Sequence, residues 1–115
     1  MKLIYVAGPF RASSSWGIEL NVRRAEALGL EVALAGAMPV IPHKNTQHFH
    51  GIGADGFWLE GALEIMRRCD AVIVVPNWED SPGTQGEVRE AEKRGQPVFF
   101  SLGELKKWLS IVEGS

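Results

Sequence analysis

The residues of this chain that are best suited to chemistry gather in two short segments. The first segment, Gly8-Pro9-Phe10-Arg11, follows a run of apolar residues. Gly8 allows a ligand or another backbone segment to approach closely, and Arg11 is suited to bind polar groups of a ligand. A tight exit from a strand, followed by a solvated arginine, is the alternative interpretation of the same residues.

The second segment, Asp80-Ser81-Pro82-Gly83-Thr84, predicts the start of a helix. Ser81 is suited to the N-cap and Pro82 to the first helical position. The free N–H groups and the dipole of such a terminus favour a phosphate or a carboxylate. Capping alone explains Ser81 and Pro82. It does not explain Gly83 and Gly86, which are poor helix formers and let another group pack against the backbone.

Glu87 is the candidate reactive group of this helix. It is next to Val88 and one turn before Ala91, both of which we expect to face inward. Its carboxylate should therefore lie at the rim of the buried face and point towards the sheet. A carboxylate in that position is costly unless it is paired or functional. A solvated glutamate, as we expect for Glu90 and Glu92, is the alternative.

Three histidines, His43, His48 and His50, share one polar stretch, residues 43–53, which we expect to be irregular. Their spacing fits no standard metal signature, and a metal site needs at least one more firm ligand. We therefore predict no metal, and we expect these side chains to line or cover the ligand site. Trp58 and Trp78 are suited to stack on a base, and equally to pack in the protein or at an oligomer interface.

The elements that position these residues alternate regularly along the chain. Apolar runs at residues 3–7, 38–41, 71–75 and 97–102 predict strands, and helical patterns occupy residues 18–35, 57–68, 82–94 and 104–112. In the second of these helices we expect Leu59, Leu63 and either Met66 or Ile65 to face inward. This alternation predicts an α/β fold of the flavodoxin-like or Rossmann-like class, a three-layer sandwich with helices on both faces of the sheet. We expect four, possibly five, parallel strands in the order 2-1-3-4. Ligands of such sheets bind beyond the carboxyl ends of the strands at the switch point, where residues 8–16 and 76–81 would meet.

The length, composition and net charge of the chain limit the classes of function. The 115 residues suit one domain spanning residues 1–115, with 45% apolar and 23% charged residues and a net charge of -2. This charge argues against a nucleic-acid polymer as partner, although it does not exclude one phosphate. Cys69, the one cysteine, fits a reducing compartment. No run approaches the ~20 apolar residues that span a bilayer, and the apolar N-terminus is too short for a signal peptide. We therefore expect a cytoplasmic protein with no membrane partner.

Several segments form one ordered series along nearly the whole chain. They are Tyr5-Val6-Ala7-Gly8-Pro9-Phe10, residues 21–27, Ile41-Pro42-His43, residues 69–81, Gly83 and Glu87. This series resembles the nucleoside 2-deoxyribosyltransferase-like superfamily, and more closely a group of small domains within it that has no settled activity. Characterised members move deoxyribose between bases or hydrolyse the N-glycosidic bond of deoxynucleoside 5'-monophosphates.

The resemblance implies roles for several carboxylates. The nucleophile of these enzymes is a glutamate on the helix after the third strand, which corresponds to Glu87. The transferases also have an aspartate in the preceding loop, for which Asp80 is the nearest match. A further family carboxylate precedes the third strand, and either Glu60 or Asp55 matches it. The opening loop and the segment around Trp78 differ from those of the enzymes.

The resemblance also implies how a substrate is held. The hydrolases bind the 5'-phosphate with small residues at the helix start, here Ser81, Gly83 and Thr84. We expect the rest of the substrate site to consist of Tyr5, Gly8, Pro9, Phe10, Arg11, His43, Asn77 and Trp78, with Tyr5 and Asn77 at strand ends to orient the sugar or base. No cofactor is expected. Related enzymes are multimers, and four tryptophans in so short a chain suit an interface, so we expect a homo-oligomer.

The chemistry itself is consistent with these residues. Breaking an N-glycosidic bond builds positive charge on the sugar, which a carboxylate beside C1' stabilises or attacks. A second acid, Asp80 or Glu60, would protonate the leaving base if its pKa is raised. We therefore predict an enzyme that cleaves or transfers at the N-glycosidic bond of a (deoxy)nucleoside or its 5'-monophosphate. The alternative is a non-catalytic module of the same fold that binds a nucleotide or phosphate. A third class, flavin-binding or phospho-acceptor domains, shares the architecture, but its motifs are missing.

Overall fold

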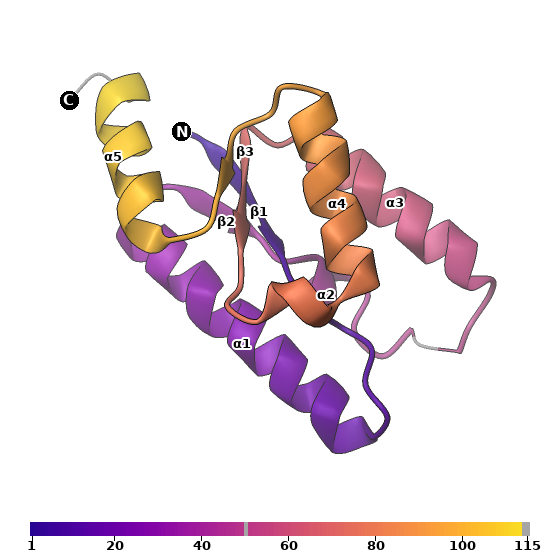
Figure 1. The fold of residues 1–115 in the computed structure, drawn as a ribbon. Helices are drawn as coiled ribbons and strands as arrows, with labels where there is room; N and C mark the ends of the chain where they lie inside the picture. Colours follow the sequence, from indigo (N-terminus) through magenta and orange to yellow (C-terminus); the bar gives the residue numbers. More distant parts are fainter. Residues whose placement is uncertain (50, 114–115) are drawn as a thin grey trace.

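The computed structural model describes residues 1–49 and 51–113 of the chain. Strands alternate with helices along the sequence (Figure 1). The elements are β1 (Leu3–Ala7), α1 (Ser15–Leu34), β2 (Met38–Val40), α2 (Pro42–Asn45), α3 (Asp55–Arg67), β3 (Ala71–Val74), the 3-10 helix η1 (Trp78–Asp80), α4 (Pro82–Lys93), β4 (Val98–Phe99) and α5 (Leu102–Val112).

The four strands of the described residues form one parallel sheet in the order β2-β1-β3-β4. This confirms the predicted α/β fold and strand order. β1 and β3 are the central strands, and they end level with one another because Ala7 pairs with Val74. Beyond this pair, the N–H of Val75 donates to the carbonyl of Ala7 at 2.9 Å. The loops after β1 and β3 therefore leave the sheet from the same edge.

The edges of the sheet are short. β2 has three residues with Pro39 at its centre, and β4 has two. The N–H of Met38 donates to the carbonyl of Lys2, next to β1. Because successive N–H groups of a strand point to opposite sides, the nitrogen of Pro39 lies on the open edge.

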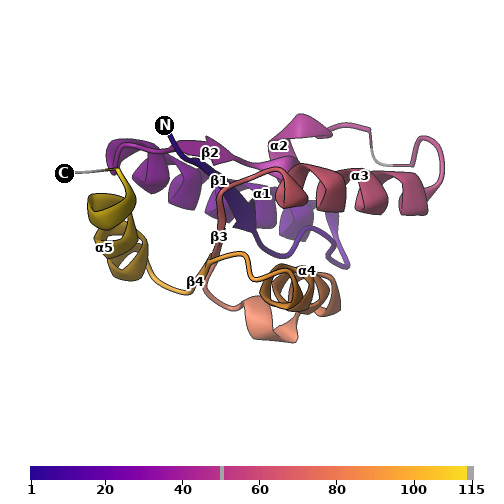
Figure 2. The ribbon, with the colours of Figure 1, turned by 90° about the horizontal axis from the view of Figure 1, so that it is seen from above.

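Each face of the sheet is covered by its own helices (Figure 2). Side chains of β1 alternate between the faces, as expected for a strand. Ile4 and Val6 pack against α1 and α5, whereas Tyr5 and Ala7 pack on the side of α3 and α4. All four residues of β3 are buried, as an apolar strand covered on both faces should be. The result is the three-layer sandwich that the sequence predicts.

Several boundaries differ from those expected, each for a local reason. α1 begins at Ser15 rather than residue 18, because the Ser14 side chain accepts a hydrogen bond from the N–H of Gly17 at 3.0 Å and caps the helix. Residues 43–53 were expected to be irregular, but the short helix α2 includes the first three of them. Pro42 occupies the first turn of this helix, where proline is favoured. The last strand is shorter than residues 97–102, because Ser101 already caps α5.

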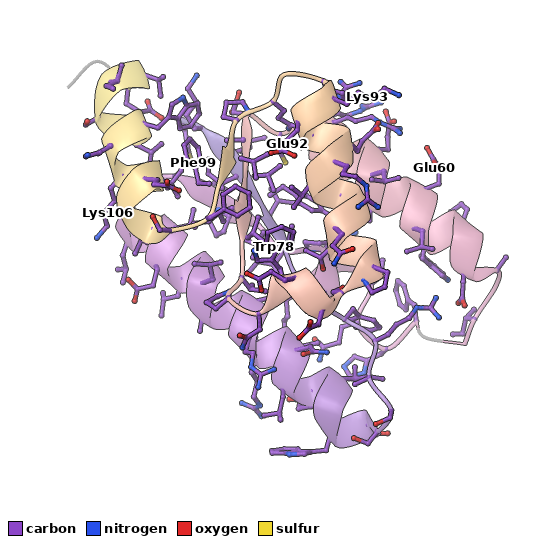
Figure 3. All side chains as sticks on the ribbon, in the orientation of Figure 1. Glu60, Trp78, Glu92, Lys93, Phe99 and Lys106 are labelled. Carbon is purple, nitrogen blue, oxygen red and sulfur yellow. The ribbon has the colours of Figure 1, made fainter. Side chains whose placement is uncertain are left out.

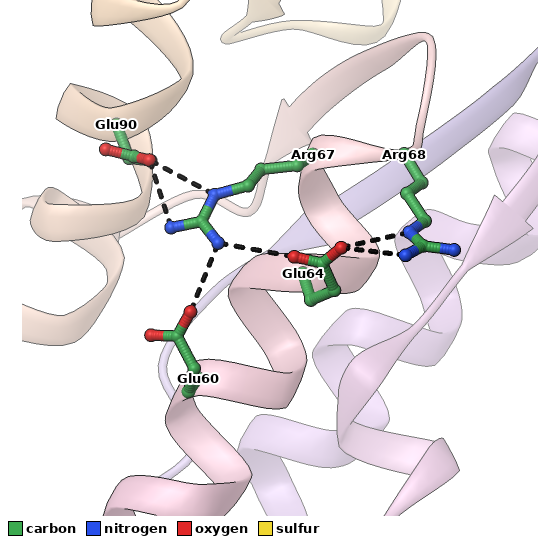
Figure 4. Close-up of polar contacts among 5 residues, drawn as sticks. All are labelled: Glu60, Glu64, Arg67, Arg68 and Glu90. Carbon is green, nitrogen blue, oxygen red and sulfur yellow. Dashed lines mark hydrogen bonds and ion pairs between the residues drawn. The ribbon is translucent and has the colours of Figure 1, made fainter.

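α3 is held against the protein mainly by its C-terminal half. Met66 is its one buried residue, and Leu59, expected to face inward, is 57% exposed. The N-terminal half of α3 extends away from α4 in Figure 1. The two helices are joined near their C-terminal ends, where the guanidinium of Arg67 lies 3.2 Å from Oε1 of Glu90 (Figure 4).

Candidate functional site

The centre of the candidate site is a hydrogen bond between a strand and a helix. The hydroxyl of Tyr5 in β1 donates to Oε2 of Glu87 in α4, with 2.5 Å between the oxygens. Tyr5 is fully buried, and Glu87 is partly buried. The neighbour of Glu87 in the chain, Val88, packs in the same apolar cluster as Tyr5. The carboxylate of Glu87 therefore points towards the sheet rather than into solvent.

Burial changes the acidity of both groups. Removal from water raises the pKa of Glu87 to about 7, against the opposing effect of the hydrogen bond from Tyr5. Burial also raises the pKa of Tyr5, and the charge of Glu87 raises it further. The phenol consequently stays protonated and acts as a donor, while the carboxyl group beside it gains and loses its proton near neutral pH. Such a group is suited to act as a base or a nucleophile.

The position of Tyr5 corrects one expectation. Tyr5 was expected at a strand end, where it would orient a sugar or base. It lies instead at the middle of β1, and its hydroxyl is occupied by Glu87. A sequence signal for this contact exists, because a tyrosine within a fully apolar strand needs a polar partner for its hydroxyl. The sequence alone does not say which residue that partner is.

The first turn of α4 is capped as the sequence predicts. The Oγ of Ser81 accepts hydrogen bonds from the N–H of Thr84 at 3.3 Å and from its hydroxyl at 2.9 Å. Thr84 is buried, and Pro82 occupies the first helical position. A Cβ atom placed on Gly83 or Gly86 would meet no atom within 4 Å. Neither glycine is therefore required by the packing of the described residues. Gly83 is exposed, and Gly86 is partly buried.

The loop after β1 is fixed by His43 of α2. His43 is buried, and its Nε2 lies 2.8 Å from the carbonyl oxygen of Pro9, so Nε2–H donates to it. The ring packs edge-on against Phe10, with centroids 5.9 Å apart. Burial lowers the pKa of His43, and this effect is larger than the opposing effect of the backbone carbonyls of Pro9 and Gly8, which raise the pKa. The ring is therefore neutral. Its Nδ1 is buried and accepts no hydrogen bond from any described residue.

Gly8 has a structural role in this loop. A Cβ atom at Gly8 would lie 2.5 Å from Cγ2 of Val75. Because both atoms cannot occupy that space, a side chain at position 8 would require the side chain of Val75 or the adjoining backbone to shift. The alternative interpretation of Gly8, a tight exit from the strand, therefore accounts for this glycine without any ligand.

The loop after β3 presents its residues at the same edge of the sheet. Asn77 is exposed and has φ 69°, the left-handed conformation that asparagine tolerates better than most residues. Trp78, labelled in Figure 3, is partly buried and stacks on Phe100 with ring centroids 5.4 Å apart. Asp80 is exposed at the end of η1 and forms no ion pair within residues 1–49 and 51–113.

The other candidate acids are held by arginines. Oε1 of Glu60 lies 3.1 Å from Nη1 of Arg67, in the network that Figure 4 shows. Oδ2 of Asp55 lies 2.9 Å from Nη2 of Arg11, which brings together two of the candidate site residues. Neither carboxylate is bonded to the Tyr5–Glu87 pair. Asp80 is therefore the candidate acid that remains free of an arginine.

Two kinds of feature are absent from the described residues. Within them, no group of three histidine, cysteine or acidic side chains is arranged to hold a metal ion. His50, one of the three histidines considered for a metal, lies outside the described residues. No helix in this part of the chain is long and apolar enough to cross a membrane.

Comparison with known proteins gives a family match and a structural match. The family described as "Domain of unknown function (DUF7768)" matches residues 2–101. No curated protein matches the sequence. The solved structure of a 2-deoxyribosyltransferase from Bacillus psychrosaccharolyticus aligns with 84% of this chain and 69% of its own, with a TM-score of 0.64 and 20% identity. At that identity the likeness shows the fold alone.

Proposed function

This chain belongs to the family described as Domain of unknown function (DUF7768), and we propose that it cleaves or transfers at the N-glycosidic bond of a (deoxy)nucleoside or its 5'-monophosphate. The observation that carries the proposal is the Tyr5–Glu87 pair, a carboxyl group with a pKa of about 7 beside a hydroxyl donor. The pair lies in a fold shared with a 2-deoxyribosyltransferase. Its acidity fits a nucleophile that works at neutral pH.

In the proposed reaction, the ionised oxygen of Glu87 attacks C1' of the sugar. The C1'–N bond breaks, and its electron pair leaves with the base. Water or a second base then displaces Glu87 from C1', as in retaining glycosidases. Tyr5 holds the attacking carboxylate in place through its hydrogen bond. Asp80, which is not paired with an arginine among the described residues, is the proposed donor of the proton for the leaving base. In the second step Asp80 takes up the proton that the water or the second base loses, which returns the site to its starting state.

The start of α4 is the proposed binding site for a 5'-phosphate. Helix N-termini attract anions through free N–H groups and the helix dipole. Ser81 and Thr84 bond to each other and fix this turn, and the uncovered Gly83 lets a phosphate reach the backbone. The remaining contacts are proposed for Gly8, Pro9, Phe10, Arg11, His43, Asn77 and Trp78. A homo-oligomer in the cytoplasm remains our expectation.

A second candidate function is a binding module without catalysis. It is favoured by one observation: Glu60 and Asp55, two of the three candidate acids, are bound by arginines. A site with a nucleophile and no acid would bind a nucleotide without releasing its base. The two candidates share the same ligand class and differ in turnover.

The test is release of free base from deoxynucleosides and their 5'-monophosphates, followed by chromatography. Glu87→Gln keeps the size of the side chain and removes its nucleophilicity. Glu92→Gln is the matched control, because Glu92 is an exposed glutamate of the same helix. We expect release by the parent protein and by Glu92→Gln, and a loss of at least about 1,000-fold in Glu87→Gln. Nucleotide binding without release from any substrate would support the binding module.

A further inference from the structure

α1 carries an apolar stripe on the side that faces away from the core. The buried residues of this helix are Val22, Ala25, Gly29 and Val32. Ala27 lies two positions from both Ala25 and Gly29, which is about half a turn of a helix, so Ala27 points outward. Five further residues lie in line with it at alternating steps of four and three positions: Trp16, Leu20, Arg23, Leu30 and Leu34. With Ala27 they form the outer stripe, in which only Arg23 is charged.

The outer stripe is open to solvent in the single chain. Trp16, Leu30 and Leu34 are 66%, 60% and 74% exposed, and Leu20 is the one member that is partly buried. α1 runs along one border of the molecule in Figure 1. The outer side of such a helix is normally polar. A strip about 30 Å long and about 10 Å wide covers about 300 Å², the size at which an apolar patch marks a contact with another molecule.

The spacing of the outer stripe indicates which kind of element covers it. Alternating steps of four and three residues return to the same line of a helix every seven positions. A side chain on that line therefore meets a partner over the whole length of α1, and the partner that fits such a line is another helix lying along it.

The charges beside the outer stripe differ between its two flanks. On one flank the carboxylates of Glu19 and Glu26 are engaged within the chain, at 3.1 Å from the side-chain nitrogens of Arg23 and Lys44. On the other flank lie Arg24 and Glu31, each one position after a member of the stripe.

Arg24 and Glu31 are charges without an opposite charge in the single chain. The guanidinium of Arg24 donates to Oδ1 of Asn21 at 3.3 Å. Neither Arg24 nor Glu31 forms an ion pair with any residue that the structure describes. One flank of the stripe therefore carries a positive and a negative charge that a partner helix can match.

A second copy of α1 matches these charges when it lies antiparallel. Arg24 lies three positions before Ala27, and Glu31 lies four positions after it. A two-fold axis close to Ala27 therefore brings Arg24 of each copy beside Glu31 of the other. The same axis places Leu20 near Leu34 of the other copy, because each is seven positions from Ala27. A parallel pair would instead oppose Arg23 to itself, and like charges repel.

We propose that the outer stripe of α1 is the interface of a dimer of this chain, in which the two α1 helices lie antiparallel across a two-fold axis close to Ala27. A two-fold dimer needs one patch that is complementary to itself, and the outer stripe with Arg24 and Glu31 has this property. The stripes of two copies together bury about 600 Å², which is small for a stable interface. The dimer is therefore reversible, and its population rises with protein concentration.

Leu30→Glu tests the interface, with Leu59→Glu as its control. Both leucines lie on helices and are exposed to a similar extent, but Leu59 lies on α3, outside the stripe. Because Leu30 is exposed in the single chain, its variant should fold. Sedimentation equilibrium over a series of concentrations measures the dissociation constant of the dimer. We expect Leu30→Glu to raise it at least about tenfold, and Leu59→Glu to leave it unchanged.

A charge exchange tests the pairing of Arg24 with Glu31. Glu31→Arg places like charges beside each other twice in the dimer, so the dissociation constant should rise about tenfold. The double variant Arg24→Glu, Glu31→Arg restores both pairs with reversed polarity. Its dissociation constant should return close to the parent value. A double variant that dimerises no better than Glu31→Arg would overturn this pairing.

Two cysteine variants test the direction of the helices. In the antiparallel dimer the two copies of residue 27 lie close together, whereas those of residue 34 are about 20 Å apart along the helix, too far for a disulfide. Ala27→Cys should therefore form a disulfide-linked dimer on mild oxidation, and Leu34→Cys should not. Cys69 is buried and adds no link of its own.

Each remaining outcome counts for or against the interface. A parent protein that is monomeric at every concentration overturns it and leaves the outer stripe to a different partner. A dimer that Leu30→Glu does not weaken, or that Leu59→Glu weakens equally, places the interface elsewhere. Cross-linking of Leu34→Cys overturns the antiparallel direction. These results stand apart from base release, because α1 and the Tyr5–Glu87 pair lie on opposite faces of the sheet.

Discussion

The hydroxyl of Tyr5 and the carboxylate of Glu87 are 2.5 Å apart, although 82 positions separate the two residues in the sequence. The contact joins the central strand β1 to α4. It exists only when β1 has paired with β3 and α4 has packed on the sheet. The reactivity of Glu87 is therefore a property of the assembled fold, and it changes with any substitution that moves either element.

Tyr5→Phe should weaken catalysis more than folding. The variant keeps the buried ring and removes the donor that lowers the pKa of Glu87, so that pKa should rise above 7. The alkaline shift would appear in the pH profile of base release, with a loss of about tenfold or more at neutral pH. We also expect a free energy of unfolding lower by about 1–3 kcal/mol. An unchanged pH profile would show that the hydroxyl does not act on Glu87.

The contribution of Glu87 to stability should fall as pH rises towards neutrality. The pKa of Glu87 is raised from 4.5 to about 7 in the folded protein. Between these values the folded state binds more protons than the unfolded chain, so the free energy of unfolding decreases with rising pH, by roughly 3 kcal/mol in all. Glu87→Gln lacks this proton and should not show the decrease. Urea denaturation of both proteins from pH 4 to 8 measures the difference, and parallel curves would contradict the raised pKa.

Ser81→Ala should affect both stability and anion binding. It removes the cap of α4, at a cost of about 1 kcal/mol. The loosened first turn should also bind a 5'-phosphate several-fold more weakly. Ser101→Ala is the matched control, since Ser101 caps α5 in the same way, accepting a hydrogen bond from the N–H of Glu104 at 3.2 Å. It should lose similar stability and keep the affinity. Equal affinities in the two variants would place the phosphate elsewhere.

His43→Leu should loosen the loop after β1. The variant leaves the carbonyl of Pro9 without its donor, which should lower the free energy of unfolding by about 1–3 kcal/mol. Hydrogen exchange should become faster at the amides of Phe10 and Arg11. Asn45→Ala, at an exposed position of the same short helix, should leave these rates unchanged. Slow exchange in His43→Leu would mean that other contacts hold the loop.

The fold was predictable because its signals are local and repeated. The apolar run at Ala71–Val74 predicts a strand covered on both faces, and Ser81 with Pro82 predicts the start of α4. The ends of helices and strands were less predictable where a capping serine starts a helix before the apolar pattern indicates it. Ser14 starts α1 early, and Ser101 ends the last strand after Phe99.

The candidate site was predictable only in part, because its contacts are long-range. The inward direction of Glu87 follows from its spacing to Val88 and Ala91. The partner of its carboxylate does not, since no local pattern connects it with Tyr5. No local pattern in the sequence predicts the ion pair between Arg11 and Asp55 either. Which acid completes the site remains a prediction, with Asp80 as the proposed one.

The proline in β2 bears on how copies of this protein meet. A sheet grows into a neighbouring molecule when a free strand offers a row of N–H and C=O groups. At one border of this sheet Pro39 has no N–H to offer on the open side, and at the other border the strand is two residues long. Neither edge strand of this sheet is therefore well suited to pair with a strand of another chain. The described sheet offers little template for fibrillar, strand-by-strand aggregation.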